Sequence, residues 1–266
     1  MTTTSPTPRS FRRLVFATGF FLAYGLWSAS ALGADAIDSD ADKILHSMSK
    51  YLGDLPAYSA KADVDNEIVD LNGQKLQLSS SVAFHIERPG NLYISRLGAF
   101  ADVEIIFNGS TLTLHGKNRK VYLQSESPGS IDDAIRKVET VIGLDAPGAD
   151  LFYSDPYPGL TSGAVSGSYL GTSYVNGVEC HYLAFRAAQV DWQIWVQTGD
   201  TPLPMKYIIT SKWITGAPQY SIRFREWDTE PSFKANQFEF SAPEGAKKIE
   251  SIQVNEVGEL MIGGAE

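Results

Sequence analysis

The sequence predicts an α+β fold in which a large antiparallel β-sheet carries only a few short helices. Apolar and polar residues alternate along many short segments, Asn-Gly pairs separate three pairs of these segments, and helical spacing occurs in only two places. The 266 residues, 43% hydrophobic and with a single Cys, suffice for a sizeable core without disulfides. We expect one domain over residues 38–249 and a loosely ordered tail over 250–266.

The first 34 residues have the pattern of a secretory signal peptide. Three arginines precede an apolar run over residues 14–32, and small residues follow it. We expect cleavage between Ala31 and Ala36, export to the periplasm and no stable membrane anchor. The alternative is an uncleaved anchor, because the run is nearly long enough to span a bilayer. The paired arginines leave open whether the general or the twin-arginine route exports the chain.

The mature chain is predicted to be acidic. Removal of the signal peptide takes away three arginines and no acid, so that 19 basic residues face 31 acidic ones and the net charge is −12. Nucleic acids and anionic membrane surfaces require a basic footprint, so neither is an expected partner. The sequence shows no basic pocket, which favours a neutral or zwitterionic ligand over an anionic one.

Two helices are predicted. The first covers residues 39–52, where a capping-box pattern precedes apolar residues at helical spacing, and Gly53 and Pro56 end it. The second begins after Ser130 and ends near Gly143, with its apolar residues on one stripe.

Three β-hairpins are predicted at Asn-Gly pairs, because two successive residues with positive φ form the primed turns that match strand twist. The hairpins join 58–68 to 76–86, 103–107 to 111–114 and 168–175 to 179–185, and further strands are expected at 92–96, 119–123, 190–196, 206–210 and 220–227. About ten strands in an antiparallel meander follow from this pattern.

The alternation places a set of apolar side chains on one face of this sheet. The set comprises Leu78, Val82, Phe84, Leu112, Leu114, Leu183 (or its neighbour Tyr182), Trp192, Ile194, Ile222 and Phe224. Two short helices can cover only part of such a face. One interpretation is an ordinary core closed by the helices. The other is a curved sheet whose concave face binds an apolar ligand beneath a helical lid, with this set as the candidate ligand contacts.

The sequence contains no recognisable catalytic, metal-binding or cofactor-binding constellation, so we expect no enzyme activity, no metal and no cofactor. Cys180 and His181 are neighbours in a predicted strand and point to opposite faces, which excludes a joint metal site or thiolate pair. His85 and His115 lie on polar strand faces and would approach each other only if their strands were neighbours.

Six segments carry a family resemblance. They are Cys180–Arg186, Val190–Trp195, Pro202–Lys206, 149–153, 218–220 and 243–247. Together they resemble domain-of-unknown-function family 2092, a family of predicted periplasmic proteins, over nearly the whole mature chain.

The resemblance implies the fold of the lipoprotein carriers LolA and LolB and of the sensor RseB. That fold is a strongly curved antiparallel half-barrel whose concave face is covered by a few short helices. It implies a non-catalytic carrier or chaperone that binds an acyl chain, lipid or lipoprotein, but it transfers no binding residue. An envelope sensor or scaffold that binds another protein through a strand edge, and a hydrolase with an unrecognised site, are the alternatives.

Overall fold

The computed structural model describes residues 36–142, 147–254 and 260–262. The helical elements are α1 (Ser39–Asp54), α2 (Ile131–Lys137) and α3 (Pro156–Thr161), with a π-helical turn η1 (Val138–Ile142) and a 3-10 turn η2 (Ala149–Phe152). The predicted signal peptide lies outside the described residues. Of the helices within these ranges, none is long and apolar enough to cross a membrane.

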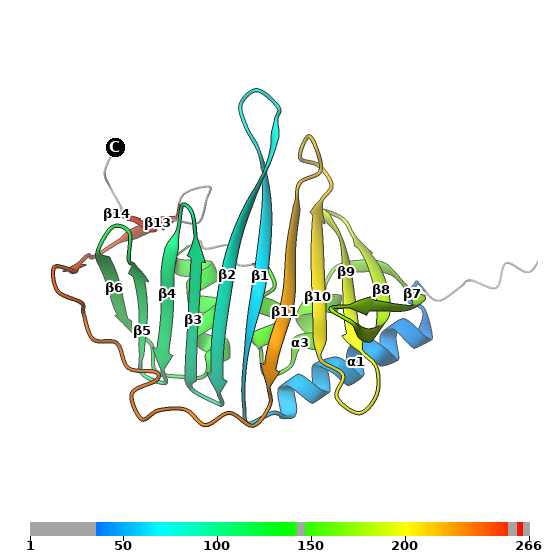
Figure 1. Cartoon of the computed structure of the whole chain (residues 1–266), viewed down its shortest axis with the longest axis horizontal. Coiled ribbons are helices and arrows are strands. Elements are labelled where there is room, and N and C mark those ends of the chain that lie inside the picture. Colours follow the sequence, from blue (N-terminus) through cyan, green and yellow to red (C-terminus); the bar gives the residue numbers. More distant parts are fainter. Residues whose placement is uncertain (1–35, 143–146, 255–259, 263–266) are drawn as a thin grey trace, which may run out of the picture. The chain divides into compact units, whose positions relative to one another are not determined.

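Twelve strands form one sheet in the order β12-β6-β5-β4-β3-β2-β1-β11-β10-β9-β8-β7 (Figure 1). The strands are β1 (Ala57–Val69), β2 (Lys75–Glu87), β3 (Asn91–Gly98), β4 (Asp102–Asn108), β5 (Thr111–Gly116), β6 (Val121–Glu126), β7 (Ala164–Val175), β8 (Val178–Ala187), β9 (Val190–Gln197), β10 (Pro204–Ser211), β11 (Gln219–Asp228) and β12 (Lys247–Lys248). All neighbours are antiparallel except β12, which runs parallel to β6. Two further strands, β13 (Ile252–Val254) and β14 (Leu260–Ile262), pair with each other.

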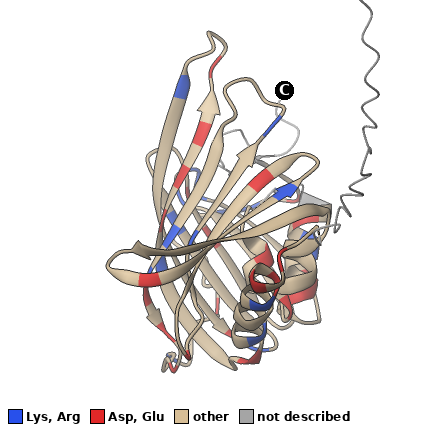
Figure 2. Ribbon diagram, turned by 90° about the vertical axis from the view of Figure 1, so that its right-hand side faces the viewer, with Lys and Arg blue, Asp and Glu red and all other residues tan. Residues whose placement is uncertain are grey.

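The sheet is open, with β12 and β7 as its edges, and it curves around the helices, which lie on its concave face (Figures 1 and 2). Helix α1 contacts β7, β9 and α3, and α2 contacts η2. Pairing of β1 with β11 joins the two meanders, which are far apart in the sequence, into one sheet. The predicted fold class, a curved antiparallel half-barrel with a few helices over its concave face, is confirmed.

Both predicted helices form; the second begins at the predicted cap, Ser130, whereas the cap of the first is Asp38, one residue before the expected capping-box pattern that starts at Ser39. Helix α1 begins after Asp38, whose side chain accepts the backbone N–H of Asp40, and one side of the helix is buried in the core. Helix α2 begins after Ser130, which forms a reciprocal capping box with Asp133. The helical cover is therefore specified locally as well as by packing.

All three predicted hairpins form, but two of their turns differ from the prediction. Only Asn176-Gly177 has positive φ at both residues, 51° and 81°. At Asn72-Gly73 and Asn108-Gly109 the glycine alone has positive φ, 82° in each case. The reason is local side-chain bonding: Asp70 accepts two backbone N–H groups in its turn, and Asn108 does so in its own. These side chains stabilise turns that leave the asparagine in an ordinary conformation.

Between β11 and β12 the C-terminal segment follows the lower ends of the strands in Figure 1 and contacts side chains of the outer face. Phe233 stacks on His85 with ring centroids 5.4 Å apart, and Phe240 contacts His115 at 5.3 Å. The segment ends in β12, which covers the edge of β6. Strands β13 and β14 fall in the predicted tail; its loose order and the domain limits stay predictions.

Candidate functional site

The ten predicted apolar residues all lie on the concave face of the sheet. Cross-strand register shows this directly: Phe84 lies opposite Ala60, which is on the same face as Phe224 opposite Ala62. The same face continues through β10, β9 and β8 on one side and through β3, β4 and β5 on the other. Tyr182, the alternative to Leu183, lies on the outer face, where it stacks on Trp195.

Most of this set belongs to the packed core. Eight members are buried, namely Phe84, Leu112, Leu114, Leu183, Trp192, Ile194, Ile222 and Phe224. Leu78 and Val82 are only half-buried. Apolar side chains of α1 and of the turn η2 pack against the buried members. The helix-covered part of the concave face is therefore core, and the role of the ten residues as ligand contacts stays a prediction.

Aromatic rings fix the centre of this core. The ring of Phe84 lies 5.0 Å from Phe152 of η2, 6.0 Å from Phe224 and 5.7 Å from Trp227 between centroids. Trp192 stacks on Phe185 at 4.1 Å. A ligand at these positions would have to displace rings that already contact one another.

Arg88, just after the end of β2, forms hydrogen bonds to the end of η2, one of the helical elements that cover the concave face. Its guanidinium donates to the carbonyl oxygens of Phe152, at 3.3 Å, and Tyr153, at 2.9 Å. The cover is thus anchored at the end of the sheet where β2 ends and β3 begins.

A second group of apolar side chains on the concave face is only half-buried. We call it the half-buried group; its members are Leu78, Val82, Ile94, Ile105, Ile209 and Tyr220. Only Leu78 and Val82 were in the predicted set. The alternation in β3, β4 and β10 was available in the sequence, but pattern alone does not show which part of an apolar face the helices leave uncovered.

One cation, Arg96 of β3, lies on the same face of the sheet as the half-buried group. Arg96 lies between Val82 of β2 and Val103 of β4 in the register of the concave face. A pocket of about 270 Å³ beside it is also lined by Leu78 and by Phe100 of the β3–β4 turn. Burial lowers the pKa of the Arg96 guanidinium. The sequence analysis did not single out this residue.

The β3–β4 turn beside this pocket lies at an end of the sheet whose loops carry exposed apolar side chains. Among the described residues, six of the nine exposed large hydrophobic side chains lie in or beside the β1–β2, β3–β4 and β10–β11 turns, which share one end of the sheet in Figure 1. They are Leu71, Leu76, Leu97, Phe100, Trp213 and Ile214. Trp213 is 74% exposed, and its indole N–H donates to the Ala188 carbonyl oxygen at 2.9 Å. The apolar character of this end is therefore a property of three separate loops.

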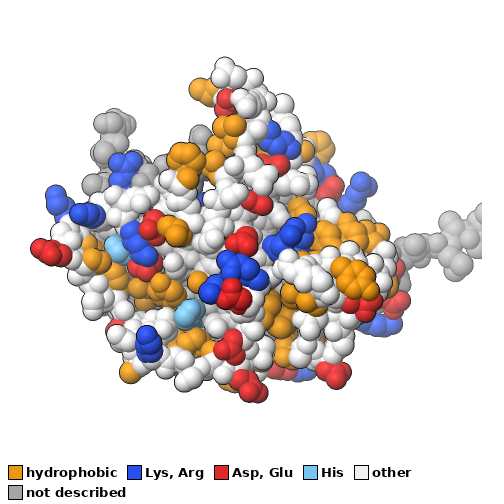
Figure 3. Space-filling model, in the orientation of Figure 1, with side chains coloured by type: hydrophobic (Ala, Val, Ile, Leu, Met, Phe, Trp, Pro, Cys, Tyr) orange, Lys and Arg blue, Asp and Glu red, His pale blue; other side chains and the backbone are white. Residues whose placement is uncertain are grey.

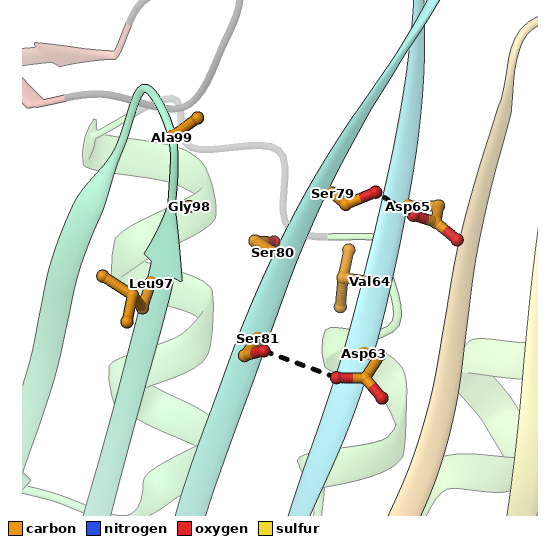
Figure 4. A pocket seen from close by; sticks show the side chains of 9 residues that line it. All are labelled: Asp63, Val64, Asp65, Ser79, Ser80, Ser81, Leu97, Gly98 and Ala99. Atoms are coloured by element: carbon orange, nitrogen blue, oxygen red, sulfur yellow. Dashed lines mark hydrogen bonds between the residues drawn. The ribbon is translucent and has the colours of Figure 1, made fainter.

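A second depression, of about 440 Å³, lies between β1, β2 and the end of β3 (Figure 4). Its polar groups bond to each other: Ser79 donates to Asp65 at 2.5 Å, and Ser81 donates to Asp63 at 3.4 Å. Asp63 is also paired with Arg225, whose hydrogen bond lowers the pKa of the Asp63 carboxyl. Figure 3 shows this outer face with acidic and basic side chains side by side near its middle. The serine hydroxyls and carboxylates named here therefore already have partners within the protein.

Cysteine and histidine side chains form no joint site in the described part of the chain. Cys180 is buried, and burial raises the pKa of its thiol. His181 points to the other face of the strand, where its Nδ1 lies 3.2 Å from the Tyr169 hydroxyl. His85 and His115 are on strands separated by β3 and β4, so the condition for a shared site is not met. No group of three or more potential metal ligands occurs within the described ranges.

The fold and this partly covered concave face define the class: an open, helix-covered antiparallel β-sheet protein. The model of the family "Predicted periplasmic protein (DUF2092)" matches residues 41–252, and the chain belongs to this family. No protein of curated function matches the chain in sequence.

Several solved structures are distantly similar. An uncharacterized conserved protein from Thermus thermophilus has a TM-score of 0.46 at 10% identity, over 79% of this chain and 98% of that one. LprF from Mycobacterium bovis has a TM-score of 0.43 at 10% identity, over 76% and 98%. The Pseudomonas aeruginosa MucA/MucB complex has a TM-score of 0.41 at 16% identity, over 77% of this chain and 62% of that one. Similarity this distant does not indicate what the present chain binds.

Proposed function

We propose that the protein binds an acyl chain or another apolar molecule against the half-buried group and acts as a non-catalytic carrier or chaperone in the periplasm. The observation that supports this is an apolar strip of concave surface that stays half-exposed beside a core that helices otherwise cover. Apolar surface gathered in a hollow of a folded protein is typical of ligand sites.

Energetics limit how such a carrier works. Burial of an acyl chain from water is favourable by about 0.8 kcal/mol per CH₂ group, whereas a chain taken from a bilayer gains almost nothing because it is already in hydrocarbon. The carrier therefore needs a donor that expels the ligand, or contacts to the ligand's head group. The pocket beside Arg96, about 270 Å³, is near the lower limit of ligand pockets, roughly 300 Å³. A long chain would have to extend along the half-buried group or shift part of the helical cover.

Titration of a fluorescent fatty acid into delipidated protein tests the proposal. We expect saturable binding, weakened by about ten-fold or more in Val82→Asp and Ile94→Asp, because a charge would lie in the apolar contact. The matched control is Leu71→Asp, at a fully exposed hairpin tip, which should bind as the wild type does. Thermal unfolding of each variant checks that it is folded. Absence of saturable binding to the wild type would contradict the proposal.

The second candidate is an envelope sensor or scaffold, and the exposed edge of the sheet favours it. Among the described residues before α1, pairing with β7 occurs only at Gly167, through Ala36 and Asp38. Val165, Leu170 and Tyr174 of the same strand are exposed hydrophobic residues. An edge strand of this kind can accept a strand from another protein.

Co-purification separates the two candidates. A stoichiometric protein partner that is lost in Leu170→Asp, but retained in Val82→Asp, would support the scaffold.

The remaining alternative is a hydrolase. Failure of a serine-hydrolase probe to label the protein would argue against the serine-dependent form of that alternative.

A further inference from the structure

Arg96 occupies an unusual position for a cation. Its neighbours across the concave face are Val82 and Val103, and Ile94 and Gly98 lie two residues away on its own strand. Its side chain is half-buried. The guanidinium is thus placed on an apolar surface that faces the ligand region proposed above.

Arg96 has no ionic partner among the described residues. Its Nε donates to the Ser80 hydroxyl at 3.2 Å. Within the described ranges, Arg96 forms no ion pair with a carboxylate. The acids of the adjacent strand, Asp102 and Glu104, are on the outer face, where both pair with Lys117. Burial lowers the pKa of the Arg96 guanidinium, and the charge interaction with Tyr220 raises it by less. An arginine has five N–H donors, and the bond from Nε to Ser80 is the one side-chain hydrogen bond that Arg96 forms with another residue of the described ranges.

A half-buried guanidinium without a counter-charge is unfavourable, because it loses hydration without gaining a charged partner. The adjoining pocket of about 270 Å³ offers space for such a partner, and it brings Arg96 together with Leu78 and Phe100. An oxyanion at this point would receive charge-assisted hydrogen bonds from the guanidinium. The apolar part of the same molecule would continue along the half-buried group.

We propose that Arg96 binds the anionic head group, a carboxylate or a phosphate ester, of an amphiphilic ligand. The inference rests on the proposed function, because the ligand's chain would occupy the surface described there. It reverses the expectation from the sequence that a neutral or zwitterionic ligand fits better. That expectation depended on the lack of a basic pocket in the sequence pattern, and pattern alone does not show that the fold places a single arginine on an apolar face.

The competing interpretation is structural: a long arginine side chain covers apolar surface while its head group reaches solvent. The two interpretations differ in selectivity. A structural arginine would bind no head group, so that removing its charge would change affinity for charged and uncharged amphiphiles alike. A head-group site would discriminate between them.

The experiment compares three amphiphiles of equal chain length, dodecanoate, dodecyl phosphate and dodecanol, by titration calorimetry at pH 8 with the mature protein. Acetate and inorganic phosphate serve as chain-free anions. The variants are Arg96→Gln, Arg96→Lys and, as a matched control, Arg223→Gln, which removes an exposed charge from the outer face of β11. Thermal unfolding confirms that each variant is folded.

We expect the wild type to bind the two anionic amphiphiles roughly ten-fold or more tightly than dodecanol. Arg96→Gln should abolish this preference and leave the affinity for dodecanol unchanged, Arg96→Lys should keep part of it, and Arg223→Gln should keep all of it. Equal affinities in the wild type, or a preference that survives Arg96→Gln, would overturn the inference while leaving the proposed function intact. Equally tight binding of acetate or inorganic phosphate would also overturn it, by indicating a site for free anions. Failure of all three amphiphiles to bind would overturn the proposed function itself.

Discussion

The rings of Phe224 and Trp227 meet on the concave face with centroids 5.3 Å apart, although the two residues are three positions apart in one strand. Regular alternation would place Phe224 and Glu226 on the same face. A β-bulge explains the difference: Lys61 lies opposite Arg225 but Ser59 lies opposite Asp228, so β11 contains one extra residue. Glu226 absorbs it with φ of 53° and forms ion pairs of 2.5 Å with Lys61 and Arg225.

Substitution at the bulge tests this relationship. Glu226→Val should destabilise the protein by about 1–3 kcal/mol, because a β-branched residue is strained at positive φ. Glu226→Gly should stay within about 1 kcal/mol of the wild type, since it relieves the strain and loses only exposed ion pairs. Urea unfolding measures both changes. Equal stability of the two variants would show that the bulge conformation is not the constraint.

Two of the Asn-Gly turns should respond differently to loss of the asparagine. Asn176→Ala should cost about 1–2 kcal/mol, because Asn176 has φ of 51° and alanine is disfavoured there. Asn72→Ala, at an exposed position with ordinary φ, should cost less than about 0.5 kcal/mol. Thermal unfolding of the pair provides the comparison, and a larger loss at Asn72 would contradict the turn assignment.

Phe84 should behave as a core residue. Phe84→Ala should cost about 3–5 kcal/mol, because the fully buried ring leaves a cavity among its aromatic neighbours. Phe100→Ala removes the same ring from a site that is 55% exposed and should cost less than about 1 kcal/mol. Chemical denaturation compares the two variants. A small loss for Phe84→Ala would indicate that this region is an open cavity.

Glu104 should make stability depend on pH in the acid range. Burial raises its pKa, but hydrogen bonds from Lys117, His115 and Tyr93 outweigh burial, and the net pKa is lowered from 4.5. A lowered carboxyl pKa stabilises the folded state above the unfolded pKa, and this contribution is lost as the pH falls through the folded value. We therefore expect Glu104→Gln to show a smaller fall in Tm between pH 7 and pH 3 than the wild type does.

The control for this titration is Glu244→Gln, which removes an exposed carboxylate near the C-terminal end of the described chain. Its pH profile should follow that of the wild type. A Glu104→Gln profile that also follows the wild type would mean that Glu104 does not contribute to acid sensitivity.

Local pattern predicted α1, α2 and strands β1 to β11, but it did not predict α3, the turn η2 or the short strands β12 to β14. The caps of α1 and α2 and the alternation in the strands are encoded within short segments. Pairing of β1 with β11 joins residues more than 150 positions apart, and no short-range signal specifies it. The bulge at Glu226 was also missed, although the sequence holds a signal for it: the apolar residue that follows Phe224 is Trp227, three positions later and not two.

The candidate site was predicted less completely, for a physical reason. Alternation identifies the face of a side chain, and all ten predicted residues do lie on one face. Exposure on that face depends on where the helices pack, which is a tertiary property. Ile94 and Ile209 were missed because their proposed role depends on their remaining only half-buried. Arg96 was missed because its proposed role depends on its having no ionic partner among the described residues.

Native mass spectrometry of the mature protein, purified from its host's periplasm without detergent and paired with lipid extraction, tests the central claim most directly. The account predicts a discrete adduct with the mass of an acyl-chain compound, released on extraction and carrying a carboxylate or phosphate. A bare polypeptide mass in a fully folded protein that also fails to take up added fatty acid would contradict it.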